Sequence, residues 1–205
     1  ALGDAIGVAD QQVSRVNANR PLREAGEVHP ADHQTAHLQA LDASTGTTVW
    51  AHDAVWDHYG TPMVWRWNDR MVAATPGGTI VDVATGDAVT SGLPEQSYLA
   101  PVVHGDRLIV AVGVSRGGVK EQGGLDVVSL DLSTASPSEQ WRTRVPLKRS
   151  LYADPVVYDG RVYMVDDGGN GFVLGLGDGA VLSSFDPTEG SMQSVFASPQ
   201  VVKGE

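Results

Sequence analysis

The 205-residue sequence contains no cysteine and few basic residues, with 14 Lys and Arg against 25 Asp and Glu. The absence of cysteine excludes disulfide bonds, thiolate catalysis and zinc–thiolate sites. The formal net charge of −11 argues against nucleic acid, which requires a basic surface, and against anionic membrane surfaces. No apolar run approaches the roughly 20 residues of a membrane-spanning helix, and no helical periodicity extends beyond a turn or two. The sequence therefore predicts an all-β chain with no nucleic-acid partner and no membrane insertion in this segment.

A strand–turn–strand unit organises the chain, and its clearest copy covers residues 40–50. Gly46 can adopt the positive φ that tight hairpin turns require. Asp42 can accept hydrogen bonds from the backbone N–H groups of the turn. The β-branched residues 47–49 suit the returning strand. Trp50 ends the unit with a large ring and one N–H donor, which suits a junction between two packed sheets.

This unit recurs at residues 81–89, at residues 130–141 with an insertion, and in a divergent form at residues 174–182. A second kind of hairpin precedes each copy, most clearly at residues 101–110 and 155–165. Asp, Asn or Gly forms its turn, and Arg followed by alternating apolar residues comes next. The residues predicted to build the turns and to dock neighbouring sheets are Asp42, Gly46, Trp50, Asp82, Gly86, Asp131 and Trp141.

An aromatic residue lies three positions before the proline that opens each unit. The prolines at positions 62, 101, 155 and 199 are 39, 54 and 44 residues apart. Four strands in each period of roughly 40–50 residues are typical of propeller blades. We expect blades at about 5–53, 60–92, 99–145 and 152–187, with an incomplete fifth at 196–205. Because the chain begins without Met and stops inside a hairpin, we expect a fragment of a larger ring. The aromatic–proline pairs are Tyr59–Pro62, Tyr98–Pro101, Tyr152–Pro155 and Phe196–Pro199.

The loops between blades carry the candidate binding residues, because loops at one end of a rigid scaffold are where ligands bind. Asp57 and His58 could act as an acid–base pair. Alternatively, Trp56 and Tyr59 cover the core between blades and Asp57 caps a turn. Since the aromatic–proline element recurs, we expect an aromatic collar at one mouth of the channel, which could be structural packing or a site for a flat ligand. The candidate ligand-binding residues are Trp56, Asp57, His58, Tyr59, Tyr98 and Tyr152.

Two segments could hold a metal ion. His29, His33 and His37 are spaced by four, which on a helix would place three imidazoles on one face. Pro30 interrupts that run, so the alternative is a solvated loop. Residues 166–171 form an oxygen-rich loop of the kind that hard cations favour, but they lack the EF-hand spacing and its closing Glu. A plain glycine-rich turn is the alternative. We therefore assign no metal-binding residue in either segment.

The repeat Ala-Leu-Asp-x-x-Thr-Gly-x-x-x-Trp, together with the Pro-Val-Val-x-Asp-Gly-Arg-Val-Tyr hairpin, resembles the repeat of the quinoprotein (PQQ-like) β-propeller family. The resemblance implies a ring of seven or eight blades in which the Trp docks between neighbours. Only Trp50 and Trp141 keep that Trp, and Thr90 and Ser183 stand at the equivalent places. The family's quinone-dependent dehydrogenases carry a vicinal cysteine pair and a Glu/Asn/Asp calcium set. This sequence has no cysteine pair, and the calcium set cannot be matched to it.

The resemblance implies three candidate functions. The first is a non-catalytic scaffold in the cell envelope or outside the cell, which binds a protein partner or a small molecule, as the family's outer-membrane assembly lipoproteins do without quinone. The second is a PQQ-dependent alcohol or sugar dehydrogenase with calcium, whose catalytic residues lie partly outside this segment. The third is a protein-interaction module with an exposed apolar patch. A periplasmic or extracellular location is expected, with a signal peptide upstream.

Overall fold

The computed structural model describes residues 13–19, 37–52, 60–96, 99–112, 124–147, 150–186, 195 and 197–202, with side chains from Leu38 onward. Within these residues every regular element is a strand, and no helix is long and apolar enough to cross a membrane. The strands are β1 (Val13–Asn19), β2 (His37–Asp42), β3 (Thr48–His52), β4 (Met63–Trp67), β5 (Arg70–Ala74), β6 (Ile80–Asp82), β7 (Ala88–Thr90), β8 (Val102–His104), β9 (Arg107–Val112), β10 (Leu125–Asp131), β11 (Ser138–Val145), β12 (Val156–Tyr158), β13 (Arg161–Val165), β14 (Gly171–Gly175) and β15 (Val181–Phe185).

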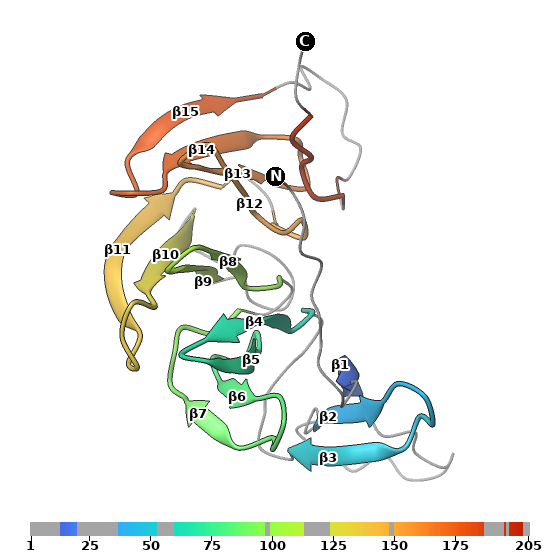
Figure 1. The fold of residues 1–205 in the computed structure, drawn as a ribbon. Coiled ribbons are helices and arrows are strands. Elements are labelled where there is room, and N and C mark those ends of the chain that lie inside the picture. Colours follow the sequence, from blue (N-terminus) through green and yellow to red (C-terminus); the bar gives the residue numbers. More distant parts are fainter. Residues whose placement is uncertain are drawn as a thin grey trace, which may run out of the picture.

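These strands form four antiparallel sheets in which strands adjacent in the sequence are also neighbours in space. We call the sheets blade 1 (β1–β3), blade 2 (β4–β7), blade 3 (β8–β11) and blade 4 (β12–β15). The blades follow one another along an arc, with the last strand of each at the outer rim (Figure 1). This radial order of antiparallel sheets confirms the predicted all-β propeller architecture. Blade 1 has three described strands, of which β2 and β3 correspond to the third and fourth strands of the other blades. β1 pairs with β2 and therefore corresponds to the second strand.

Apolar side chains alternate along the central strands and fill the space between successive blades. In β9, Ile109 and Ala111 belong to the core shared with blade 4, whereas Leu108 and Val110 belong to the core shared with blade 2. This is the two-residue period of a strand that is covered on both faces. A third and smaller core, around Leu38, joins blades 1 and 2. Burial between blades is therefore the main apolar force that holds the arc together.

A β-bulge recurs at the same place in the outer strand pair of all four blades. A bulge adds one residue to a strand and re-aims the side chains beside it. Here it fixes which outer-strand residue faces the next blade, at the position where the repeat places tryptophan. The facing pairs beside the bulge are Ala40–Trp50, Ile80–Thr90, Ser129–Trp141 and Val173–Ser183.

Trp50 and Trp141 link their blades to the next by a hydrogen bond and by close ring packing. The indole N–H of Trp50 donates to the carbonyl of Val83 in blade 2 (2.8 Å), and that of Trp141 donates to the carbonyl of Leu176 in blade 4 (2.9 Å). A Cβ on Gly86 would lie 2.7 Å from the Trp50 ring, and one on Gly179 would lie 2.6 Å from the Trp141 ring. Only glycine lets the ring approach the turn so closely.

Blade 2 has Thr90 at the docking position, and Trp67 from its first strand makes the link to blade 3 instead. The indole N–H of Trp67 donates to the carbonyl of Leu132 (2.7 Å), and the residue is only 6% exposed. Leu132 directly follows the turn residue Asp131, just as Val83 follows its own turn aspartate. All three described junctions therefore use the same backbone acceptor, although the donor comes from two different strands.

The turn aspartates serve the turns themselves. Asp42 Oδ1 accepts hydrogen bonds from the hydroxyls and backbone N–H groups of Ser44 and Thr45. These bonds, the Ser44 hydroxyl first, lower the pKa of Asp42 to about 2. The backbone N–H of Ser133 lowers the pKa of Asp131 in the same manner. Carboxylates that accept several such bonds stay ionised and hold the turn geometry.

Replacing Trp67 tests the substitute docking link. We expect Trp67→Phe to lower the free energy of unfolding by about 1–3 kcal/mol, because the buried carbonyl of Leu132 loses its donor. Urea unfolding would measure this change. Trp65→Phe is the matched control, since Trp65 contacts the same core, and it should cost less. Equal losses for the two variants would contradict the role assigned to the Trp67 N–H.

Ser129 offers a test in the opposite direction. It is fully buried, and its hydroxyl has no hydrogen-bond partner; the facing residues at the equivalent positions of the other blades are Ala, Ile and Val. We expect Ser129→Ala to raise the free energy of unfolding by about 1 kcal/mol, because it removes an unpaired buried polar group. The exposed control Ser136→Ala should change nothing measurable. A destabilised Ser129→Ala protein would contradict this account.

Candidate functional site

The two ends of each blade differ in the segments that they carry. Because strands in a blade alternate in direction, the turns between strands one and two and between strands three and four lie at one end, which we call the turn end. The middle turns and the segments that join one blade to the next lie at the opposite end, the loop end. Tyr152, the candidate ligand-binding residue that the structure describes, belongs to a segment of the loop end. That end is therefore where a binding site is expected.

One of the six candidate ligand-binding residues lies within the described part of the chain. Tyr152 is half-buried between Leu151 and Ala153, both of which are buried. The aromatic collar therefore stays a prediction. Of the three histidines, His37 opens β2 without a described side chain, and the other two lie outside the described residues. The remaining candidates, Trp56, Asp57, His58, Tyr59 and Tyr98, also lie outside the described residues.

The residue before each strand-opening proline joins successive blades at the loop end. The backbone N–H of Ala100 in blade 3 donates to Asp154 Oδ1 in blade 4 (2.8 Å). The backbone N–H of Asp154 in turn donates to Ser198 Oγ (3.0 Å). Ala100, Asp154 and Ser198 occupy the same place in the aromatic–proline element. The element thus forms two successive links, from blade 3 to blade 4 and from blade 4 to the segment that contains Ser198, which we call the pre-proline ladder.

The middle turns hold the inter-blade segments in place by a second repeated contact. The backbone N–H of Gln96 donates to the carbonyl of Pro76 in blade 2 (2.7 Å). The N–H of Val195 donates in the same way to the carbonyl of Asp167 in blade 4 (3.0 Å). These bonds satisfy backbone groups that strand pairing leaves open. Main-chain hydrogen bonds consequently hold these inter-blade segments against the middle turns of blades 2 and 4.

The oxygen-rich loop of blade 4 uses its buried carboxylate internally. Asp166 Oδ1 accepts hydrogen bonds from the backbone N–H groups of Gly168 and Asn170 and from the Asn170 amide, and the same amide also reaches Oδ2. A cation would have to displace these N–H donors. Within the described residues, no three His, Cys, Asp or Glu side chains are grouped as metal ligands. The carboxylate of Asp166 is therefore used within its own loop.

Two buried polar atoms of the loop end have no hydrogen-bond partner, Gln96 Nε2 and Asp167 Oδ1. Gln96 is 5% exposed, and its Oε1 accepts the backbone N–H of Ala111 (2.7 Å). Both N–H donors of the Gln96 amide are therefore unpaired between blades 2 and 3. An unpaired buried group of this kind costs stability. The sequence analysis includes Asp167 in the oxygen-rich loop of residues 166–171 but does not single out Gln96.

A hollow of about 590 Å³ lies at the turn end of blade 2, opposite the predicted site. Arg70 Nη1 and Asp82 Oδ2 face each other there at 3.9 Å. The hollow is open and polar, and sequence reasoning did not predict it, because its residues are ordinary turn residues. It is lined by Asn68, Asp69, Arg70, Asp82, Thr85, Asp87, Ala88 and Val89.

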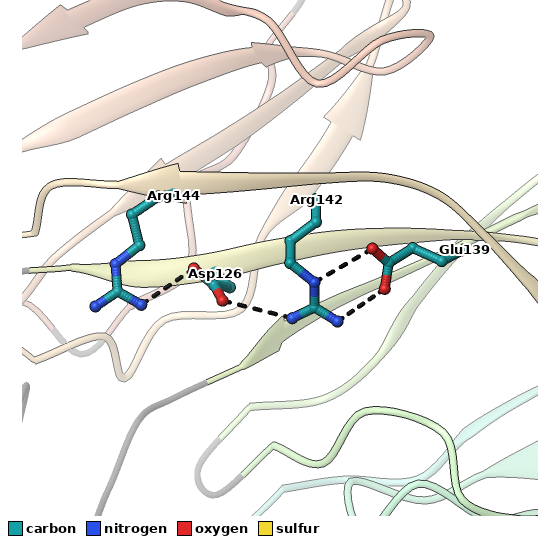
Figure 2. Close-up of polar contacts among 4 residues, drawn as sticks. All are labelled: Asp126, Glu139, Arg142 and Arg144. Carbon is teal, nitrogen blue, oxygen red and sulfur yellow. Dashed lines mark hydrogen bonds and ion pairs between the residues drawn. The ribbon is translucent and has the colours of Figure 1, made fainter.

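Figure 2 shows the densest charge network among the described residues, on the outer strands of blade 3. Arg142 forms two parallel bonds to Glu139 (2.8 and 3.2 Å), and both Arg142 and Arg144 contact Asp126 (3.5 and 3.1 Å). The bonds to Glu139 raise the pKa of Arg142. Half-exposed pairs contribute little to stability, but charges on an outer strand discourage pairing with foreign strands.

Comparisons with known proteins identify the fold. The sequence matches no protein-family model, and no curated protein is significantly similar to it. BamB from Moraxella catarrhalis is structurally similar with a TM-score of 0.56 and 19% identity, over 78% of this chain and 46% of that chain. The quinohemoprotein alcohol dehydrogenase from Comamonas testosteroni is similar with a TM-score of 0.51 and 15% identity, over 75% of this chain and 33% of that chain.

This chain therefore spans less than half the length of either solved structure. At such low identity the likeness shows the fold alone. The chain has the β-propeller fold that its repeats predict, and the two solved structures are proteins of different kinds. One propeller fold hosts many functions, so function has to be argued from the side chains.

The pre-proline ladder generates a test with a matched control. We expect Asp154→Ala to lower the free energy of unfolding by about 1–3 kcal/mol and to speed hydrogen exchange at the Ala100 amide, which loses its acceptor. Asp154→Asn removes the same charge but keeps an oxygen, so it should retain most of the protection. If both variants expose the Ala100 amide equally, charge rather than the hydrogen bond would explain the effect.

Proposed function

We propose that the chain is part of a non-catalytic scaffold that binds a protein partner at the loop end of its propeller. The observation that supports this most directly is that two carboxylates of the loop end already accept hydrogen bonds from the propeller itself. Asp154 joins blades 3 and 4, and Asp166 closes its own loop. These carboxylates hold the scaffold together instead of facing a reacting molecule.

A rigid propeller whose blades are joined at both ends can present loops of any composition without losing its fold. The loop end also carries the half-buried Tyr152, a residue type that is enriched at protein interfaces. The fold likeness to BamB and the family resemblance support a location in the periplasm or outside the cell. A net charge of −11 favours a partner with a basic surface.

The rival function is a quinone-dependent dehydrogenase, which the fold likeness to the Comamonas testosteroni enzyme brings into consideration. It would require PQQ and calcium at the loop end. A calcium ion at the loop of residues 166–171 would have to displace the N–H groups that donate to Asp166. A small-molecule ligand that stacks on the aromatic collar would be a further form of the binding function.

The proposal is tested by placing a photo-crosslinking residue at position 152 of the loop end and, as a control, at position 104. His104 is exposed at the turn end of blade 3. In the cells that produce the protein, we expect position 152 to crosslink to one specific protein and position 104 to give none. Equal labelling from both positions, or none from position 152, would contradict a loop-end partner.

A titration with PQQ and calcium separates the rival. We expect no saturable change in quinone absorbance or in melting temperature, because the carboxylate of Asp166 is already hydrogen-bonded within its own loop. A saturable rise in melting temperature, together with dye-linked oxidation of an alcohol, would replace the scaffold function by the dehydrogenase.

A further inference from the structure

The turn between the third and fourth strands has two different lengths in the blades that receive a docking ring. In blades 2 and 4 it has four residues, 83–86 and 176–179, and its last residue is a glycine at positive φ. In blade 3 it has six residues, 132–137, because Asp131 pairs directly with Ser138. None of these six residues is glycine, and none has a positive φ. The turn that receives the ring of blade 2 is therefore of another kind.

The glycine decides whether the ring of an outer-strand tryptophan fits against the turn. A Cβ on Gly86 would lie 2.7 Å from the ring of Trp50. A Cβ on Gly179 would lie 2.6 Å from the ring of Trp141. Every residue of the blade 3 turn carries a Cβ, so a ring placed in the same way would find no gap there. Blade 2, which faces this turn, has Thr90 where blades 1 and 3 have tryptophan.

The first hairpin of blade 2 is longer than the first hairpins of blades 3 and 4. Asp82, the last residue of the third strand, aligns across the sheet with Trp65. The equivalent residues of blades 3 and 4 align with His104 and Tyr158, and each of these directly precedes its turn. Trp67 therefore lies two residues beyond the usual end of a first strand, on the same face as Trp65. At about 3.3 Å per residue, the extension carries the ring roughly 7 Å further towards the turn end.

This extension brings a first-strand ring to the longer turn of blade 3. The indole N–H of Trp67 donates to the carbonyl of Leu132 (2.7 Å), the first residue of the six-residue turn. Trp65, at the usual place, packs against the same core, with its ring centroid 6.4 Å from that of Trp67. Among blades 2, 3 and 4, one hairpin is extended and one turn has six residues, and the two meet at the same junction.

We propose that the receiving turn selects the strand that supplies the docking ring. A four-residue turn that ends on glycine accepts an outer-strand tryptophan, whereas the six-residue turn without glycine accepts the ring of an extended first hairpin. Blade 3 is thus matched to blade 2 and mismatched to blade 1, whose donor is the outer-strand Trp50. Such mismatches discourage wrong docking among similar repeats. This selection goes beyond the proposed scaffold function and does not rest on it.

A double substitution tests the selection with the native turn of blade 3. Trp67→Phe frees the carbonyl of Leu132, and Thr90→Trp then offers an outer-strand ring in its place. We expect the introduced indole N–H to exchange with solvent at least ~10-fold faster than the docked indole N–H of Trp141, because the turn leaves the ring no gap. Hydrogen exchange followed by NMR resolves each indole separately. Equal protection of the two indoles would overturn the proposal.

Shortening the turn should reverse that result. Replacing residues 133–137 by Ala-Thr-Gly, the sequence of residues 84–86, gives blade 3 a four-residue turn and keeps Leu132. In the chain that also carries Trp67→Phe and Thr90→Trp, the introduced indole N–H should then be as protected as that of Trp141. A folded chain in which the shorter turn gives this indole no added protection would contradict the selection.

Gly86→Ala tests the same rule at the junction of blades 1 and 2, and it decides the question even where the shortened turn prevents folding. The added Cβ should displace the ring of Trp50 and speed exchange of its indole N–H at least ~10-fold. Gly92→Ala is the matched control. Gly92 has nearly the same φ as Gly86, +76° against +81°, but open space for a Cβ, so the control carries the backbone strain without the collision. Equal exchange of the Trp50 indole in the two variants would refute the selection.

Discussion

The structure depends on one backbone carbonyl in each of blades 2, 3 and 4, that of the residue directly after the third strand, where the turn to the fourth strand begins. The N–H groups of Val83, Leu132 and Leu176 bond within their own blades, to Met71, Asp106 and Gly160. Their carbonyls point out of the blade, towards the blade before it. A buried carbonyl needs a donor, and an indole N–H supplies it at each described junction. The hydrogen bond fixes where the ring lies, and the apolar cores then close around it.

Two local features make this geometry repeatable. The β-bulge beside each outer-strand docking position turns that residue towards the next blade, and a glycine at positive φ in the receiving turn removes the Cβ that the ring would strike. Neither feature depends on long-range contacts, so each blade can form its half of the junction before the junction exists. The turn carboxylate of Asp42, held ionised by four hydrogen bonds, stabilises the receiving turn in the same local way.

The sequence predicts the features that are local and fails where the donor moves to another strand. The turns around Gly46 and Gly86, and the strand that ends on Trp50, follow from short-range chemistry that a repeat makes visible. The role of Trp67 could not be predicted, because the repeat points to Thr90 and gives no sign that the first strand supplies the ring. The ladder through Asp154 was equally hidden: the proline beside it was noticed, but the hydrogen bond spans 54 residues. The candidate binding residues stay predictions, because five of the six lie outside the described residues and a recurring aromatic–proline element does not show what each ring contacts.

The exchange of Thr90 for Trp67 shows what a junction in this fold requires and what it tolerates. The acceptor carbonyl is invariant among the described junctions because it belongs to the backbone, whereas the donor can come from the rim (Trp50) or from the inner strand (Trp67). A propeller that can dock from either strand can lose a tryptophan without losing a blade contact. Blade order is then set by backbone geometry, and side chains at the opposite end are left to diversify. This separation of docking from loop composition is what a binding scaffold needs, because its surface can change while its ring does not.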